Sequence, residues 1–275
     1  VSYLLVFVKI KEKTMRKMKS LALLAMAALV VGCSGSKDVE QASVSELYTK
    51  GSNALQEGGY SEAIRYLKAA NERFPGSIYQ EQAMIDLIYA NYKSQNYTDI
   101  ETLGNDFIRM FPQSQNQPYV IYMTGLAYSA MSDNFIQDFF GIDRATRETV
   151  SMRNAFNYFQ GLVTHFPNSP YTQDALARMA YIKAALARHE LDIAKFYAKR
   201  DAWVAVSNRV VGMLKQYPDA QATYEGLFLM KEAYNKMGLT TLENQTQQII
   251  DANKGKSFEA VEKPKEPELA LPKVK

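Results

Sequence analysis

The sequence predicts an all-α protein built from stacked helical hairpins, on three observations. Apolar residues recur at helical spacing, as at Ala83, Leu87 and Ala90, whereas sustained apolar-polar alternation, which indicates strands, is missing. Small and polar turn residues separate the apolar segments. Aromatic-proline pairs, which can end helices, recur along the chain at Phe74-Pro75, Phe111-Pro112, Phe166-Pro167 and Tyr217-Pro218.

The spacing of these pairs indicates a repeat. The first two pairs are separated by about the 34 residues of a tetratricopeptide unit, and the later spacings are longer by roughly 20 residues. We therefore expect a tetratricopeptide-repeat solenoid of about five helix hairpins, because each hairpin must stack on its neighbours to bury its two apolar faces. The expected ten helices lie near residues 44–57, 60–74, 77–94, 97–111, 117–131, 150–166, 170–199, 202–216, 220–237 and 240–252.

The first hairpin shows the packing pattern most clearly. Gly51 and Ala63 are small and would let its two helices approach closely, with Tyr60 at the turn. The later turns are expected at Gln95-Asn96-Tyr97, Asp201-Ala202-Trp203 and Met237-Gly238-Leu239.

Parts of the chain fall outside the repeat domain, which we place at residues 44–253. Residues 133–148 form an insertion with three phenylalanines and a charged Asp-Arg pair; it is either an aromatic plug that folds back on its hairpin or a contact surface for another protein. Residues 254–275, with alternating Lys and Glu around three prolines, have little apolar surface and are expected to be a disordered tail.

The N-terminal region has the features of a bacterial lipoprotein signal. Residues 15–32 combine basic residues with an apolar run too short to span a bilayer, and the small Gly32 precedes Cys33, the only cysteine. We expect cleavage before Cys33 and attachment of lipid, including palmitate, to its thiol, with residues 33–43 as a tether; the alternative is a free buried thiol. Ser34, in place of Asp, favours the periplasmic face of the outer membrane. We interpret residues 1–14 as an extension from an upstream start; the alternative is a true extended leader.

Composition argues against nucleic-acid binding and catalysis. Residues 1–32 hold six of the 32 Lys and Arg and one of the 29 Asp and Glu, so the remaining chain has a net charge of about −2 and no basic excess for nucleic acid. Neither His165 nor His189 has a partner at metal-ligand spacing, and neither a glycine-rich phosphate loop nor a nucleophile elbow occurs. We expect no metal, no cofactor and no enzymatic activity.

Tyrosines are concentrated on the expected first helices of the hairpins, which line the concave face of a solenoid. For any one of them, packing between hairpins is the simpler interpretation, but some are expected to face the groove and bind an extended peptide. These tyrosines are Tyr79, Tyr89, Tyr92, Tyr119, Tyr122, Tyr128, Tyr181, Tyr197 and Tyr234.

Several sequence stretches between residues 15 and 252 resemble the BamD family. Members of this family are the tetratricopeptide lipoproteins of the outer-membrane β-barrel assembly machinery. The stretches that carry the resemblance are Leu87-Ile88-Tyr89-Ala90 with Tyr92-Lys93, Phe107-Ile108-Arg109, Tyr122-Met123 with Gly125-Leu126, Phe139-Phe140-Gly141-Ile142-Asp143-Arg144, and Arg200 with Ala202-Trp203-Val204-Ala205-Val206 and Asn208-Arg209. Two positions depart from the family pattern. Asp201 replaces a turn glycine, and Thr124 replaces a frequent arginine that could contact ligands in the groove.

The resemblance implies a non-enzymatic scaffold. Such a protein binds the POTRA region of a BamA-type barrel protein, carries the other Bam lipoproteins and receives unfolded outer-membrane proteins. The implied substrate-binding residues, on the N-terminal hairpins, are Phe74, Tyr79, Tyr89 and Tyr92. The implied partner-binding residues are Arg200, Trp203, Asn208 and Arg209, joined by Phe139, Phe140, Asp143 and Arg144 of the insertion.

Two questions stay open at this point. Trp203 is either a packing aromatic of its turn or a contact residue, whereas we expect Arg200 to be a charged contact. The alternative function for the whole chain is a periplasm-facing tetratricopeptide adaptor for peptidoglycan enzymes; the lack of sustained heptads and the presence of the insertion disfavour it.

Overall fold

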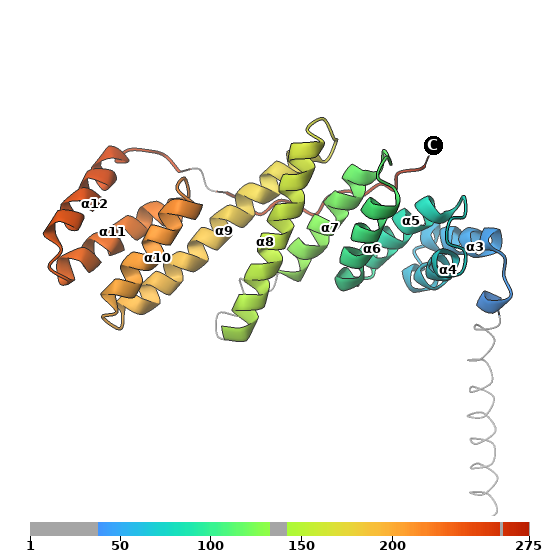
Figure 1. Ribbon diagram of the computed structural model, residues 1–275, viewed down its shortest axis with the longest axis horizontal. Coiled ribbons are helices and arrows are strands. Elements are labelled where there is room, and N and C mark those ends of the chain that lie inside the picture. Colours follow the sequence, from blue (N-terminus) through green and yellow to red (C-terminus); the bar gives the residue numbers. More distant parts are fainter. Residues whose placement is uncertain (1–37, 133–141, 259–260, 275) are drawn as a thin grey trace, which may run out of the picture. The chain divides into compact units, whose positions relative to one another are not determined.

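A computed structural model describes residues 38–132, 142–258 and 261–274, and for residues 142–148 it describes the backbone alone (Figure 1). These ranges are helical and contain no β-strand, which confirms the all-α, tetratricopeptide-like prediction. The helices are α3 (Val44–Gln56), α4 (Tyr60–Arg73), α5 (Gln80–Lys93), α6 (Tyr97–Met110), α7 (Gln117–Met131), α8 (Ile142–His165), α9 (Thr172–Ala198), α10 (Trp203–Gln216), α11 (Gln221–Lys236) and α12 (Thr240–Ala252).

The ten expected helices are all present, and their bounds lie within a few residues of those expected, with one exception. Helix α8 begins at Ile142 and not near residue 150, so part of the expected insertion has a helical backbone. No glycine or proline occurs between Ile142 and Gln160, which removes the usual reasons for a helix to start later.

The described chain forms two compact units, residues 38–90 and residues 91–274. In the first unit, α3 packs against α4. A Cβ atom added at Gly51 of α3 would lie 2.7 Å from Cγ of Leu67 on α4, so the helices approach as closely as the small residues predict. A capping box formed by Ser43 and Glu46 begins α3.

In the second unit, each helix from α6 to α12 packs against the next, and α9 also packs against α11, the first helix of the following hairpin. Helix α7 lies at the core of this unit, since nine of its 15 residues are buried. Thr124 is among them: it is fully buried and donates to the carbonyl of Val120 at 2.9 Å. The expectation that position 124 faces a ligand groove is therefore wrong, because close approach to α6 leaves no room for an exposed contact there.

The turns inside four hairpins share one backbone conformation. Each has a residue with positive φ, followed by a residue with φ between −80° and −88° and ψ near 61° that precedes the second helix. The positive-φ residues are Gly58 (77°), Gln95 (63°), Asp201 (55°) and Gly238 (70°). Asp201 thus adopts the left-handed conformation for which the family's turn uses glycine.

The aromatic-proline pairs end the second helices in the expected way. The amide groups of the four aromatic residues each donate to the carbonyl four residues earlier, at distances of 2.7 to 3.3 Å, and proline then prevents continuation. These residues are Phe74, Phe111, Phe166 and Tyr217.

The chain after α12 has neither helix nor strand in residues 256–258 and 261–274, in keeping with its low apolar content. It nevertheless makes contacts within the second unit: the Phe258 ring lies 5.3 Å from the Tyr224 ring, and the Lys265 carbonyl accepts a hydrogen bond from Arg178 at 2.8 Å. In Figure 1 this segment, drawn in red, runs back from α12 along the unit. Within the described ranges, no helix combines the length and apolar character needed to cross a membrane.

Candidate protein-binding surfaces

Arg200 lies at the exposed corner between α9 and α10. Its guanidinium carbon is 3.5 Å from the centroid of the Phe196 ring, and Nη1 donates to the Phe196 carbonyl at 3.3 Å. Among the described residues, no carboxylate forms an ion pair with it. Phe196 is 48% exposed and Val204 is 63% exposed, so the corner offers apolar surface beside a cation. A corner of this kind can dock an acidic and apolar surface of another protein.

The neighbouring candidates on α10 have different surroundings. Trp203 is half-buried, with the Lys236 ammonium group 5.9 Å from its ring centroid, and Asn208 is exposed. Arg209 forms an ion pair with Glu190 at 2.9 Å. The four predicted residues therefore lie on the turn after α9 and along the first half of α10, where Arg200 and Asn208 are the more accessible.

The candidates in the insertion are described only in part. Phe139 and Phe140 lie outside the described residues. Asp143 and Arg144 lie in the first turns of α8, and the placement of their side chains is outside the description too. Cys33, the expected site of lipid attachment, also lies outside the described residues.

Three of the four expected substrate-binding residues lie in the first unit. Phe74 is half-buried and packs against the core formed by Leu47, Tyr66 and Ala70. Tyr79 stacks on Tyr48 with ring centroids 5.0 Å apart, and its hydroxyl donates to Oγ of Ser45 at 3.4 Å. This packing fixes Phe74 and Tyr79 while leaving part of each ring accessible.

The third, Tyr89, is half-buried and meets the Tyr60 ring edge-on at a centroid distance of 6.5 Å. Beside these aromatic residues, Asp86 is 4% exposed and accepts a hydrogen bond from Nε2 of Gln82 at 2.7 Å. Burial raises the pKa of Asp86 to about 6, while hydrogen bonds from Gln82 and Tyr48 oppose that rise. The first unit therefore holds a buried carboxylate that is hydrogen-bonded to Gln82 and Tyr48, which periodicity alone did not reveal.

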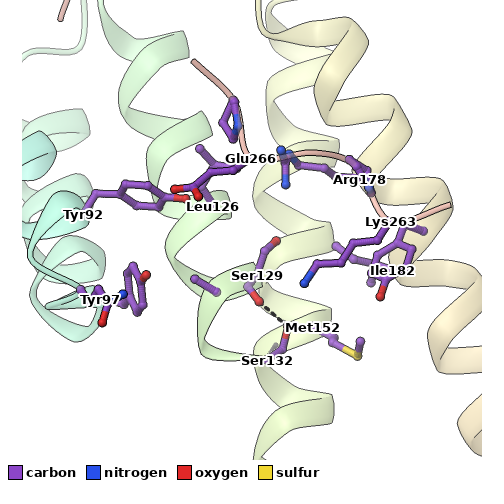
Figure 2. Close-up of a pocket in the computed structure, with 15 residues that line it drawn as sticks. Tyr92, Tyr97, Leu126, Ser129, Ser132, Met152, Arg178, Ile182, Lys263 and Glu266 are labelled. Atoms are coloured by element: carbon purple, nitrogen blue, oxygen red, sulfur yellow. Dashed lines mark hydrogen bonds between the residues drawn. The ribbon is translucent and has the colours of Figure 1, made fainter. Parts of the chain in front are cut away.

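Tyr92, the fourth candidate, belongs to the second unit and is only 8% exposed. Its ring meets the Tyr97 ring edge-on, with centroids 5.6 Å apart. Both tyrosines line a cavity of about 370 Å³ (Figure 2). The expected set is therefore divided between the two units.

Arg178, which lines this cavity, belongs to a polar network that sequence reasoning missed. The hydroxyl of Tyr122 donates to Oδ2 of Asp174 at 2.6 Å, and the same carboxylate is paired with the guanidinium group of Arg178 one turn along α9. Burial and the neighbouring carboxylate raise the pKa of Tyr122 well above its ordinary value. The spacing of Asp174 and Arg178, four residues apart on a helix, was the signal that could have revealed the pair.

Of the nine tyrosines expected on first helices, several are core residues. Tyr119, Tyr122 and Tyr128 are buried, and Tyr122 stacks on Tyr171 with ring centroids 4.9 Å apart. Packing is therefore the correct interpretation for these three. In the part of the chain that the structure describes, no group of His, Cys, Asp and Glu side chains could hold a metal ion.

The helical hairpins, which in the second unit pack one against the next, define a tetratricopeptide-like helical-repeat protein with exposed cationic and aromatic side chains. The model of the YfiO family, described as outer membrane lipoprotein, matches residues 40–249. The chain therefore belongs to the YfiO, or BamD, family of outer membrane lipoproteins.

Similar curated proteins carry one name, outer membrane protein assembly factor BamD. The protein of Haemophilus influenzae is 74% identical over 95% of this chain and 100% of its own length. That of Pasteurella multocida is 62% identical over 94% of this chain and 99% of its own length. That of Vibrio cholerae is 38% identical over 86% of this chain and 99% of its own length.

Proposed function

We propose that the chain acts in outer membrane protein assembly as a non-enzymatic scaffold. In this role, the second unit docks on the POTRA region of a BamA-type barrel protein, and the aromatic surface of the first unit receives unfolded outer-membrane proteins. The other Bam lipoproteins are further partners, and lipid on Cys33 holds the chain to the membrane. The printed names of relatives that match nearly the whole chain support the assembly role.

The observation that carries the docking proposal is the exposed corner at Arg200. Its guanidinium group stacks on Phe196 and pairs with no carboxylate among the described residues, which leaves its charge available for a partner. A cation held on an aromatic ring loses little conformational freedom when it binds an acidic group. Asn208 and the exposed Val204 extend this surface along α10, and the insertion, with Phe139, Phe140, Asp143 and Arg144, supplies a further contact.

The receiving surface is proposed for Phe74, Tyr79 and Tyr89 in the first unit. Tyr92, the fourth expected residue, belongs to the second unit and is proposed as a separate substrate contact there. The rings in the first unit are half-buried and fixed by neighbouring rings or by the core. Fixed aromatic rings offer contact area to an extended apolar segment at a low cost in entropy.

The docking proposal is tested by the Arg200→Glu variant. We expect it to bind the isolated POTRA region at least about tenfold more weakly than the parent, because the substitution puts like charges against the partner surface. Isothermal titration calorimetry measures the affinity, and far-UV circular dichroism should show unchanged helix content.

The matched control is Lys199→Glu, which makes the same charge change at the adjacent exposed residue. We expect it to affect the affinity much less. Equal affinity of the parent and the Arg200→Glu variant would contradict the docking proposal, and loss of helix content in that variant would make Arg200 a structural residue.

A further inference from the structure

The C-terminal segment forms part of the wall of the cavity in the second unit. Lys263, Pro264, Glu266 and Pro267 line it together with residues of α6, α7 and α9. Figure 2 shows the segment crossing the cavity, with Tyr92 and Leu126 on one side and Arg178 and Ile182 on the other. The cavity is thus a groove between helices that is already occupied by an extended piece of the same chain.

The burial pattern of the segment matches a ligand in a groove. Pro264 and Pro267 are half-buried, whereas Lys263, Lys265 and Glu266 are exposed. Prolines three residues apart share one face of an extended chain with three residues per turn, as in polyproline II. Since proline has no N–H group, burying that face leaves no backbone donor unsatisfied.

Arg178 provides the specific contact. It is 9% exposed, and its Nη2 donates to the backbone carbonyl of Lys265 at 2.8 Å. The paired carboxylate of Asp174, which also accepts from Tyr122, fixes the guanidinium group in place. Burial alone would lower the pKa of Arg178, but the bonds to Asp174 and Tyr122 raise it, so the group stays charged.

This contact recognises the backbone and not a side chain. Because the carboxylate of Asp174 already fixes the guanidinium group, Arg178 can donate a charged hydrogen bond to any backbone carbonyl at this position along the groove. Little conformational entropy is lost when that bond forms. The same arrangement would accept a peptide from another chain, provided that the peptide is extended and carries small apolar residues such as proline at the buried positions.

We propose that this cavity is a binding groove for an extended, proline-containing polypeptide segment of a partner protein, and that the chain's own residues 261–267 occupy the groove until such a segment replaces them. The groove is lined by residues of the second unit alone, so it requires neither the Arg200 corner nor the aromatic surface of the first unit. Proline and alternating Lys and Glu define the chemistry of the segment that fits, as they do in the segment now bound.

The test uses the full chain with Lys263 to Pro267 replaced by alternating glycine and serine, here called the opened variant. A fluorescein-labelled synthetic peptide of residues 261–274 is the probe, and fluorescence anisotropy measures its binding. We expect saturable binding to the opened variant and at least about tenfold weaker binding to the parent, in which the tethered segment competes at an effective concentration on the order of millimolar.

Adding Arg178→Gln to the opened variant should weaken peptide binding about tenfold or more, since a charge-assisted hydrogen bond is lost. Arg109→Gln on α6 is the matched control, because Arg109 is exposed and pairs with Asp106 outside the cavity. It should leave the affinity unchanged, and thermal unfolding should show both variants folded.

Two results would overturn the proposal: no saturable binding to a folded opened variant, or equal affinity for the opened variant and the parent.

Discussion

Asp86 shows how a single buried group can link stability to pH. Its carboxylate lies among the side chains of α3 and α5, with Gln82 and Tyr48 as hydrogen-bond partners, and burial raises its pKa to about 6. In the unfolded chain the same group titrates near 3.8. Between these two values the folded state holds a proton that the unfolded state has released, so the contribution of Asp86 to stability falls as the pH rises from about 4 to about 6.

The Asp86→Asn variant removes this titration while keeping the shape of the side chain. We expect the variant to gain stability relative to the parent as the pH rises, by on the order of 1–3 kcal/mol between about pH 4 and pH 7. Urea unfolding of both proteins at the two pH values, followed by circular dichroism, measures the difference. A difference in unfolding free energy that is the same at both pH values would show that Asp86 titrates normally.

At the scale of the elements, the sequence pattern predicted the positions of the helices better than the contacts that each helix makes. The helical spacing of apolar residues and the aromatic-proline pairs that end helices are local signals. They predicted the bounds of α3 to α7 and α9 to α12 to within a few residues. The early start of α8 was missed because its first turns contain polar residues, which do not show which face is buried. The bond from Arg178 to Lys265 joins residues 87 positions apart, so no local pattern could reveal it.

The site predictions divide in the same way. Arg200 was recognised as a charged residue without a role in packing, and it is exposed. The tyrosines could not be sorted, because a tyrosine that packs and one that faces a groove occupy the same helical positions; α7 buries three of them. Asp174 and Arg178 have the four-residue spacing of the ion pairs that are common on exposed helix surfaces, so their spacing on α9 does not show that the pair is buried.

The repeated hairpin turn makes a prediction of its own. Gly238 has a φ of 70°, and nothing lies within 4 Å of an added Cβ, so only backbone strain opposes a side chain there. Gly238→Ala should lower the unfolding free energy by about 1 kcal/mol, because a left-handed conformation is costly for an L-residue.

Gly161→Ala is the matched control for this turn. Gly161 lies inside α8, where an added Cβ also meets nothing within 4 Å. Alanine there should raise stability by roughly 0.5–1 kcal/mol, since glycine weakens helix interiors. Chemical denaturation measures both variants, and effects of the same sign would contradict the assignment of strain to the turn.

At the scale of the whole molecule, the two compact units carry different surfaces. The first holds the fixed rings of Tyr79 and Tyr89, and the second holds the Arg200 corner and the occupied groove. A scaffold that brings a substrate to a barrel protein needs separate surfaces for the two, because one surface cannot bind both at once. This division favours the assembly role over a protein with a single ligand site.

The central claim, that the chain is a scaffold of the β-barrel assembly complex, is tested most directly by affinity purification. The tagged mature lipoprotein is isolated from detergent-solubilised outer membrane, and the proteins that accompany it are identified by mass spectrometry. We expect a POTRA-containing barrel protein together with small lipoproteins, with the barrel protein depleted when Arg200→Glu is the bait. Recovery of peptidoglycan synthases or hydrolases without that barrel protein would contradict the claim and identify the chain as an adaptor for those enzymes.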